Sequence, residues 1–210
     1  AAKTELPEPY KVESLNRDIL VMGGGIAGLT AAKEAATAGY NVTLVEKAAV
    51  LGGKANGWRK QFPTKAPWTD LESPTIADMV KNVESESNIT VKTETEVARI
   101  GGAPGAYKVT LKAAGTKSEW DAPEKISADE QDAIDKGTME NPNTGLKDYM
   151  ANNPDAQTFG SVVLATGWTP ADVSEYEHLG HGKFKNVVTN AEFEKLAKDG
   201  KVPAKVAFVQ

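Results

Sequence analysis

A glycine-rich turn between a short apolar segment and a helix-forming segment is the feature that most constrains this chain. Residues 18–22 (DILVM) have strand length, and glycines follow them at once. Gly23, Gly25 and Gly28 then fit the pattern G-x-G-x-x-G. In that pattern the first glycine makes the tight turn, the second lets the backbone approach a pyrophosphate, and the third lets helix and strand pack closely. The segment therefore predicts a dinucleotide-binding strand–turn–helix unit.

The residues after this turn complete such a unit. Helix formers run from Ile26 and Ala27 to residue 38, a glycine follows, and residues 41–45 predict a second strand. Glu46, at the tip of that strand, lies 18 residues after the last glycine of the turn, with Lys47 beside it. A carboxylate there accepts hydrogen bonds from ribose hydroxyls and repels a 2′-phosphate. The helix N-terminus supplies free N–H groups and about half a unit of positive charge for a pyrophosphate.

A second glycine pair follows the acidic residue. Gly52 and Gly53 come six residues after it and let the chain pass close to a ligand. Lys54 and Arg59 are then near enough to meet phosphate or an electron-rich ring. The alternative for these two residues and Lys60 is an ordinary solvated basic loop.

A third segment of small residues follows another apolar strand. Residues 161–165 (SVVLA) are typical of a buried strand. The last of them, Ala165, begins the segment A-T-G, which continues with Thr166 and Gly167. Small residues at the end of a strand allow the backbone to approach a ligand.

The rest of the chain predicts one interrupted domain. We expect an extended arm over residues 1–17, a domain over residues 18–116 and 158–210, and an acidic insertion over residues 117–157. The insertion holds ten acidic and four basic residues, a capping box of Ser127 and Glu130, and a second short helix at 146–151. Further expected elements are a helix at 75–84, one strand at 88–100, its hairpin partner at 106–111, a helix at 190–198 and a strand beginning at 205–209.

Composition excludes several function classes. The net charge of −5 gives no electrostatic case for nucleic acid or an anionic membrane. The apolar run around residues 19–32 is broken by four glycines and is too short to span a bilayer, so we expect no membrane insertion. The chain has no cysteine, which excludes disulfides and cysteine-ligated clusters within it. His178 and His181 have no carboxylate set at ligand spacing, so we expect no metal. No pattern suggests a nucleophile or an acid–base catalyst. The default expectation is a cytoplasmic protein.

Together, the first glycine turn with Glu46, the Gly52–Gly53 pair and the A-T-G segment resemble the FAD-binding domain of the flavoproteins with two dinucleotide-binding domains. The resemblance implies an α/β, Rossmann-like FAD-binding domain with a parallel sheet and a β-hairpin or meander. It places the ADP half of FAD over the first glycine motif. It also places Val97 beside the adenine and the A-T-G segment beside the cofactor, at the crossing to the second domain.

Longer segments narrow this resemblance. The segments VEKAAVLGGKANGWRKQFPT, ATGWTPAD, GHGKFKNVVTNAEFEKL and KVAFVQ are similar to the A-type flavoprotein subunits of heterodisulfide reductase and to their relatives in the quinone-interacting membrane-bound oxidoreductase (Qmo). This implies an FAD-carrying electron-transfer subunit with iron–sulfur partner subunits. Relatives often carry cysteines after F-P-T, whereas this chain has none, so any cluster lies elsewhere. Family members also continue beyond the strand expected at 205–209, so we expect the chain to be part of a longer protein.

Three alternatives stay open. The segment LGGKANGW also suits an FAD-dependent desaturase or an amine-oxidase-like enzyme, although the last third of the chain fits that branch poorly. An interaction subunit that has lost its cofactor would keep the same fold. A domain that binds only NAD does not explain the second glycine pair followed by A-T-G.

Overall fold

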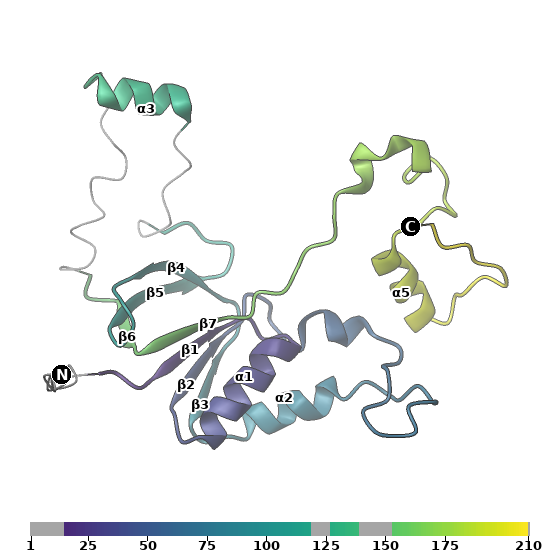
Figure 1. Ribbon diagram of the computed structural model, residues 1–210, viewed down its shortest axis with the longest axis horizontal. Coiled ribbons are helices and arrows are strands. Elements are labelled where there is room, and N and C mark those ends of the chain that lie inside the picture. Colours follow the sequence, from purple (N-terminus) through teal and green to yellow (C-terminus); the bar gives the residue numbers. More distant parts are fainter. Residues whose placement is uncertain (1–14, 119–126, 139–152, 210) are drawn as a thin grey trace, which may run out of the picture.

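The computed structural model describes residues 15–118, 127–138 and 153–209, and its centre is a parallel sheet (Figure 1). The sheet has four strands in the order β3-β2-β1-β7. Its strands are β1 (Ile19–Met22), β2 (Val42–Val45), β3 (Ile89–Lys92) and β7 (Ser161–Leu164). All neighbouring pairs are parallel. The predicted α/β class with a parallel sheet is therefore confirmed.

Two helices cover one face of this sheet, α1 (Ile26–Thr37) and α2 (Ile76–Glu84). Leu29 of α1 and Val83 of α2 are buried in one cluster with Val21 and Leu44 of the strands. The helical spacing predicted for residues 75–84 is thus confirmed, because the apolar side of α2 faces the core. The Lys33 ammonium also donates to Glu86, which joins α1 to the end of α2.

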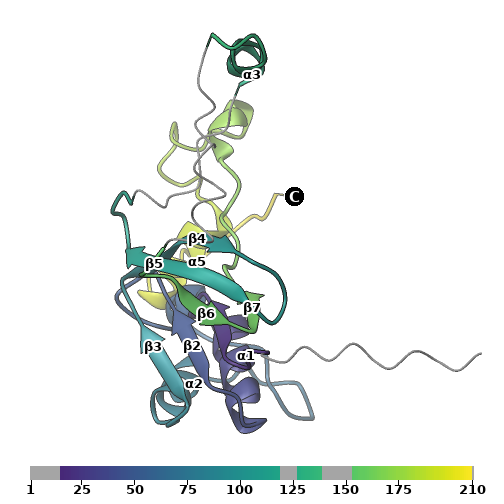
Figure 2. The ribbon, with the colours of Figure 1, turned by 90° about the vertical axis from the view of Figure 1, so that its left-hand side faces the viewer.

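A three-stranded antiparallel sheet covers the other face (Figure 2). Its strands are β4 (Thr95–Gly101), β5 (Tyr107–Ala113) and β6 (Gln157–Phe159). Leu20 and Val45 point from the parallel sheet into a second buried cluster with Val109 and Phe159. Successive side chains of a strand point to opposite faces, so the continuous apolar strands β1 and β2 supply both cores. The predicted hairpin is confirmed.

The single strand predicted over residues 88–100 is wrong in one respect. The structure divides it into β3, which belongs to the parallel sheet, and β4, which belongs to the antiparallel sheet. Between them Glu94 has a φ of 48°, a left-handed conformation that turns the chain. The alternation of β-branched residues continues through the turn with Thr93 and Thr95, so the pattern alone does not reveal the change of sheet.

Two expectations for buried strands also need correction. Strand β7 lies at the edge of the described sheet, and its Leu164 is 71% exposed. Residues 205–209 form no strand, and Phe208 and Val209 are exposed. Both segments are apolar enough for a sheet interior. Among the described residues, however, β7 has a neighbouring strand on one side only, and residues 205–209 pair with no strand.

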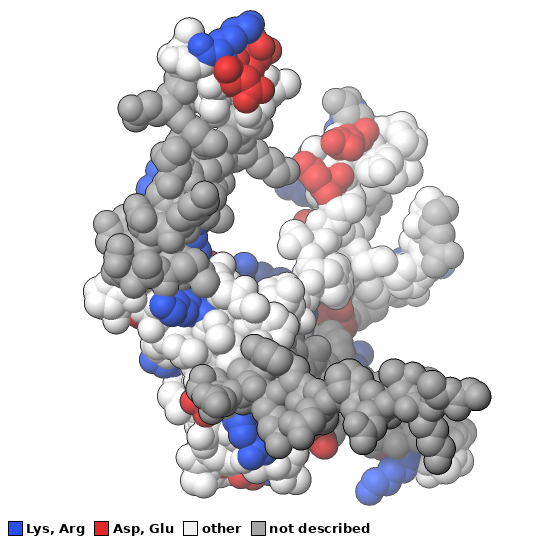
Figure 3. All heavy atoms as spheres, turned by 60° about the vertical axis from the view of Figure 1, so that its left-hand side comes forward, with Lys and Arg blue, Asp and Glu red and all other residues white. Residues whose placement is uncertain are grey.

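The described helix of the acidic insertion is α3 (Ala128–Asp135), which stands away from both sheets (Figure 1). Ser127 and Glu130 form the predicted capping box, and no residue of α3 is buried. Its charged side chains are seen at the top of Figure 3, where basic residues elsewhere on the visible face are scattered and form no continuous patch. The helix expected at 146–151 and residues 1–14 of the arm lie outside the described residues.

After β7 the chain leaves the sheet and forms three short helices. These are η2 (Val173–Glu175), η3 (Glu177–Leu179) and α5 (Asn190–Lys198). The bounds of α5 agree with the prediction for residues 190–198. Its contact with the domain includes Lys198, whose ammonium donates to the Asn56 carbonyl.

A capping carboxylate makes α5 sensitive to acid. The Glu192 Oε2 atom accepts hydrogen bonds from the Thr189 N–H (2.7 Å) and from its hydroxyl (3.0 Å), and lies 3.0 Å from His181 Nε2. The Thr189 backbone bond and then the His181 bond hold the pKa of Glu192 below its ordinary value of 4.5. A lowered pKa contributes stability at neutral pH that is lost as the pH falls through it.

We therefore expect Glu192→Gln to weaken amide-exchange protection of residues 190–198 at pH 6, and to change it less at a pH below the lowered pKa of this carboxyl group. The reason is that the wild-type carboxylate becomes protonated as the pH falls through that pKa and then no longer caps as an anion. A deficit of the same size at both pH values would contradict this role. Glu194→Gln, on the same helix, is the matched control.

Candidate functional site

The three predicted segments meet at the carboxyl ends of the parallel strands. The Gly23 N–H donates to the Val45 carbonyl (2.7 Å), and the Ala165 N–H donates to the Met22 carbonyl (2.8 Å). The Gly52 N–H donates to the carbonyl of Gly24 in the first turn (2.7 Å). The end of a parallel sheet is where α/β proteins bind ligands. The backbone thus joins both later segments to the first turn.

Two glycines of the first motif are required by the fold itself. Gly23 has a φ of 108°, and a Cβ atom there would lie 2.3 Å from the Ala165 carbonyl oxygen. A Cβ atom on Gly28 would lie 1.7 Å from the Gly23 carbonyl oxygen. These contacts agree with the tight turn and the close helix–strand packing that the motif predicts.

Gly25 differs from these two because its surroundings are open. A Cβ atom on Gly25 would meet nothing within 4 Å, although it adjoins the tightly packed turn. Gly25 is the N-cap of α1, and no side chain caps this helix. The first N–H groups of a helix have no intrahelical partner, and Ile26 and Ala27 are exposed. The site therefore offers an anion open backbone donors and the positive end of a helix dipole.

Glu46 is held beside this turn by two backbone groups. Its Oε2 atom accepts a hydrogen bond from the Gly24 N–H (2.6 Å), and its Oε1 atom accepts one from the Ala48 N–H (2.8 Å). The side chain is nearly buried, with 9% of the residue exposed. An ionised carboxylate has about four acceptor positions, so acceptor capacity is left for ribose hydroxyls. The predicted residue is thus at the strand tip and rigidly oriented.

The second glycine pair packs against the first turn. Gly52 has a φ of 107° and precedes the short helix η1 (Gly53–Gly57). A Cβ atom on Gly53 would lie 3.1 Å from the Gly25 Cα atom. The absence of side chains therefore lets two backbone segments meet beside the uncapped helix end. Contact of this pair with a ligand stays a prediction.

Trp168 is a residue of this region that the sequence pattern did not single out. The Lys54 Nζ atom lies over its indole ring, 3.2 Å from the ring centroid, which is a cation–π contact. Trp168 is 66% exposed. The only available signal was its position directly after Gly167, which does not by itself indicate a partner. The contact brings the second glycine segment and the A-T-G segment together.

The remaining predicted residues lie in the same region, where fewer contacts hold them in place. Lys47 is exposed directly after the carboxylate, and Thr166 and Gly167 are exposed after β7. Val97 lies on β4 and packs against the second core. Residue Thr95 of the same strand donates its N–H to the Glu46 carbonyl (3.0 Å), which ties β4 to this end of the sheet. The role of Val97 beside an adenine stays a prediction.

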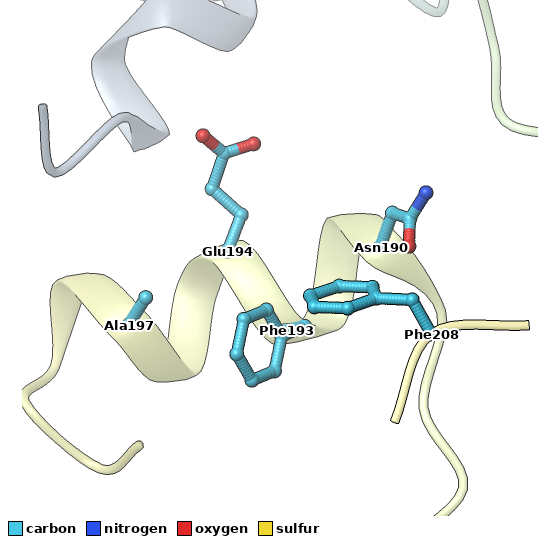
Figure 4. A pocket seen from close by; sticks show the side chains of 5 residues that line it. All are labelled: Asn190, Phe193, Glu194, Ala197 and Phe208. Atoms are coloured by element: carbon cyan, nitrogen blue, oxygen red, sulfur yellow. The ribbon is translucent and has the colours of Figure 1, made fainter. Parts of the chain in front are cut away.

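Two hollows of the described structure lie elsewhere. One, of about 310 Å³, lies beside α5, where the rings of Phe193 and Phe208 meet edge to face with centroids 5.6 Å apart (Figure 4). The other, of about 560 Å³, includes Arg17 and Tyr40 at the opposite end of the parallel sheet. Neither is lined by a predicted cofactor residue. The N-terminus of α1 offers backbone donors beside Glu46, and we assign the cofactor site from this recognition chemistry.

Two other classes of site have no counterpart in the described ranges. No group of three or more histidine, cysteine, aspartate or glutamate residues lies close enough together there to hold a metal ion. His181 is hydrogen-bonded to Glu192, and His178 contacts the Tyr176 ring edge to face. In the same ranges, no helix has both the length and the apolar character needed to cross a bilayer.

Comparison with known proteins supports a flavoprotein interpretation of this geometry. Residues 18–119 match the family described as FAD dependent oxidoreductase. The A subunit of the ferredoxin/F(420)H(2)-dependent CoB-CoM heterodisulfide reductase of Methanosarcina acetivorans is 26% identical over 251 aligned positions. The alignment covers 93% of this chain and 31% of that protein.

Two further relatives carry similar names. The first of two iron-sulfur A subunits of the CoB–CoM heterodisulfide reductase of Methanopyrus kandleri is 27% identical, with 96% of this chain and 38% of that protein covered. A protein of Archaeoglobus profundus, described as like the A subunit of heterodisulfide reductase, is 35% identical over 57% of this chain and 17% of its own length. The similarity expected from the sequence is confirmed. The chain spans less than two fifths of each of these relatives.

Proposed function

We propose that this chain, whose residues 18–119 match the FAD dependent oxidoreductase family, is the FAD-holding part of an electron-transfer subunit in a larger redox complex. The family match over residues 18–119 and the relatives support an FAD-dependent oxidoreductase with FAD as its cofactor. Electron transfer between the flavin and iron–sulfur partners is the finer part of the proposal. When bound, the flavin supplies the redox chemistry, and the protein holds and orients it.

One observation carries the proposal: an uncapped helix N-terminus faces open space at Gly25, beside the oriented carboxylate of Glu46. We assign the pyrophosphate to the N–H groups at Gly25, Ile26 and Ala27, and the adenosine ribose to Glu46. Gly53 and Lys54 adjoin the phosphate and ribityl region. Thr166 and Gly167 lie along the far side, and Val97 is assigned to the adenine.

The names of the relatives support the partner part of the proposal. They are called A subunits of heterodisulfide reductases, and one of those names includes the word iron-sulfur. The chain has no cysteine, so the cysteine-ligated clusters of this proposal lie outside these 210 residues. The cytoplasmic location expected from the sequence stays a prediction.

Anaerobic reduction of the FAD-loaded chain tests the electron-transfer role. We expect the oxidised flavin band to recover when an oxidised ferredoxin is added as a one-electron acceptor, without any organic substrate. A flavin that is instead reduced by an organic substrate, which is itself oxidised, with no partner protein present would indicate the desaturase or amine-oxidase branch. A chain that cannot be loaded with FAD would indicate a cofactor-free interaction subunit.

The Lys54–Trp168 contact predicts two losses of FAD affinity of different size. We expect Lys54→Met to weaken FAD binding severalfold, because it removes the cation next to the second glycine pair. Trp168→Leu should weaken it less, by about two- to fivefold, since an exposed cation–π contact is worth about 0.5–1 kcal/mol. Fluorescence titration with FAD measures both. The matched control is Lys60→Met, on the following loop, and an equal loss in that variant would contradict the assignment.

A further inference from the structure

A basic segment stands out in this acidic chain. The whole chain has a net charge of −5, yet residues 47–69 contain no aspartate or glutamate. The basic residues in that segment are Lys47, Lys54, Arg59, Lys60 and Lys65. The proposed function uses the first two at the cofactor. The other three belong to the loop of residues 59–72, which we call the basic loop.

The basic loop is fixed at its base. Gln61 and Glu72 exchange backbone hydrogen bonds of 2.9 and 3.0 Å across it. The Glu72 carboxylate also accepts from the Thr64 N–H (3.3 Å), and the Gln61 side-chain oxygen accepts from the Thr75 N–H (3.0 Å). These bonds close the loop onto the start of α2. The loop therefore presents a defined surface.

Three large apolar side chains of the basic loop face solvent. Phe62 is 70% exposed, Trp68 53% and Leu71 61%. Scattered single apolar residues are ordinary, whereas three exposed on one short braced loop are a feature of interaction sites. Aromatic residues and arginine are also enriched at protein–protein interfaces. The composition of the loop thus favours a protein partner.

The cations of the basic loop are available to such a partner. Arg59, Lys60 and Lys65 are exposed, and none of them forms an ion pair within the described ranges. The one acidic group inside the loop that faces solvent is Asp70, whereas the Glu72 carboxylate is used by Thr64. The surface therefore carries a local positive charge, which attracts an acidic surface and accelerates its association.

The position of the loop connects it to the cofactor site. It follows η1, whose first residue, Gly53, would place a Cβ atom 3.1 Å from the Gly25 Cα atom. In Figure 1 the loop extends at the lower right, beyond η1 and beside α2. A protein seated on it lies on the side of the domain from which η1 reaches the proposed pyrophosphate site.

We propose that the basic loop is the docking surface for an acidic iron–sulfur electron carrier of the ferredoxin type. The proposal rests on the proposed function, which supplies the flavin with which such a carrier would exchange electrons. Two observations favour this partner: the exposed cations of the loop complement an acidic surface, and the exposed Phe62, Trp68 and Leu71 suit a protein interface. Cations at an interface act mainly on the association rate and its salt dependence.

The test measures binding of a plant-type [2Fe–2S] ferredoxin, as the acidic probe, to the full chain. We expect the triple variant Arg59→Glu, Lys60→Glu, Lys65→Glu to bind at least about tenfold more weakly than wild type at low ionic strength. The difference should shrink at high salt, where exposed charges are screened. The matched control reverses three exposed lysines elsewhere, Lys81→Glu, Lys185→Glu and Lys205→Glu, which changes the net charge equally. We expect this control variant to bind the ferredoxin less than about threefold more weakly than wild type.

Three results would overturn the docking surface. They are no salt-dependent binding of the probe to wild type, an equal loss in both triple variants, and a clear preference for vesicles containing anionic phosphatidylglycerol over the ferredoxin. Phe62→Ala should accelerate dissociation of the probe, which tests the apolar part separately. The FAD content of each protein is measured in parallel. Loss of flavin without loss of probe binding counts against the proposed function, whereas normal flavin with no probe binding counts against the docking surface alone.

Discussion

Gly25→Ala is expected to remove most FAD binding while leaving the fold intact. The residue has a φ of −77°, which alanine adopts without strain, and its Cβ atom would meet no protein atom within 4 Å. In the bound state that methyl group would occupy the space through which the pyrophosphate approaches the helix end. Inserting a methyl group into a close contact costs about 1–3 kcal/mol, so FAD affinity should fall about tenfold to a hundredfold.

Gly28→Ala, only three residues away, should behave in the opposite way. Its Cβ atom would lie 1.7 Å from the Gly23 carbonyl oxygen, and both atoms belong to the packed turn. We expect this variant to unfold at markedly lower denaturant concentration, whether or not FAD is present. Urea unfolding and FAD titration of both variants separate the two effects. An unchanged FAD affinity in Gly25→Ala would contradict the assignment of the pyrophosphate to this helix end.

Glu46→Ala is expected to weaken FAD binding by about 1–3 kcal/mol, the scale of a lost hydrogen bond to a charged group. The same change leaves the Gly24 and Ala48 N–H groups without their carboxylate acceptor. The apo protein should therefore also lose some stability. FAD affinity is therefore measured without denaturant, where wild type and variant are both folded. Under that condition a lower affinity reports the lost ribose contact, separately from the loss of stability.

Glu84→Ala is the matched control for this carboxylate. Glu84 is an exposed residue at the end of α2, so its removal should change FAD affinity by less than about twofold. If Glu46→Ala keeps wild-type affinity, the ribose does not bind where we place it. If both variants weaken binding equally, a general effect of charge explains the result.

The elements near the cofactor were predictable because their signals are local. A position that needs a positive φ or has no room for a Cβ atom requires glycine, so it can be recognised in the sequence. Gly23 and Gly28 are examples. Capping boxes at Ser127 and Thr189 likewise define where α3 and α5 begin. Each of these features depends on residues only a few positions apart, so no knowledge of the tertiary structure was needed.

The incorrect predictions concern features that depend on distant parts of the chain. Whether residues 88–100 form one strand or two depends on which sheet each half joins, and the turn at Glu94 carries no glycine or proline signal. The exposure of Leu164 depends on whether another strand lies beside β7. The Lys54–Trp168 contact joins segments more than a hundred residues apart. Short sequence patterns do not indicate which distant segments come into contact.

FAD binding by this chain is tested most directly by the visible absorption spectrum of the purified protein, with the released cofactor identified after denaturation. We predict a flavin spectrum and one FAD per chain, either as purified or after reconstitution. A colourless protein that cannot be reconstituted with FAD would contradict FAD binding. The glycine turn and Glu46 would then be parts of a flavoprotein fold that serves an interaction role without its cofactor.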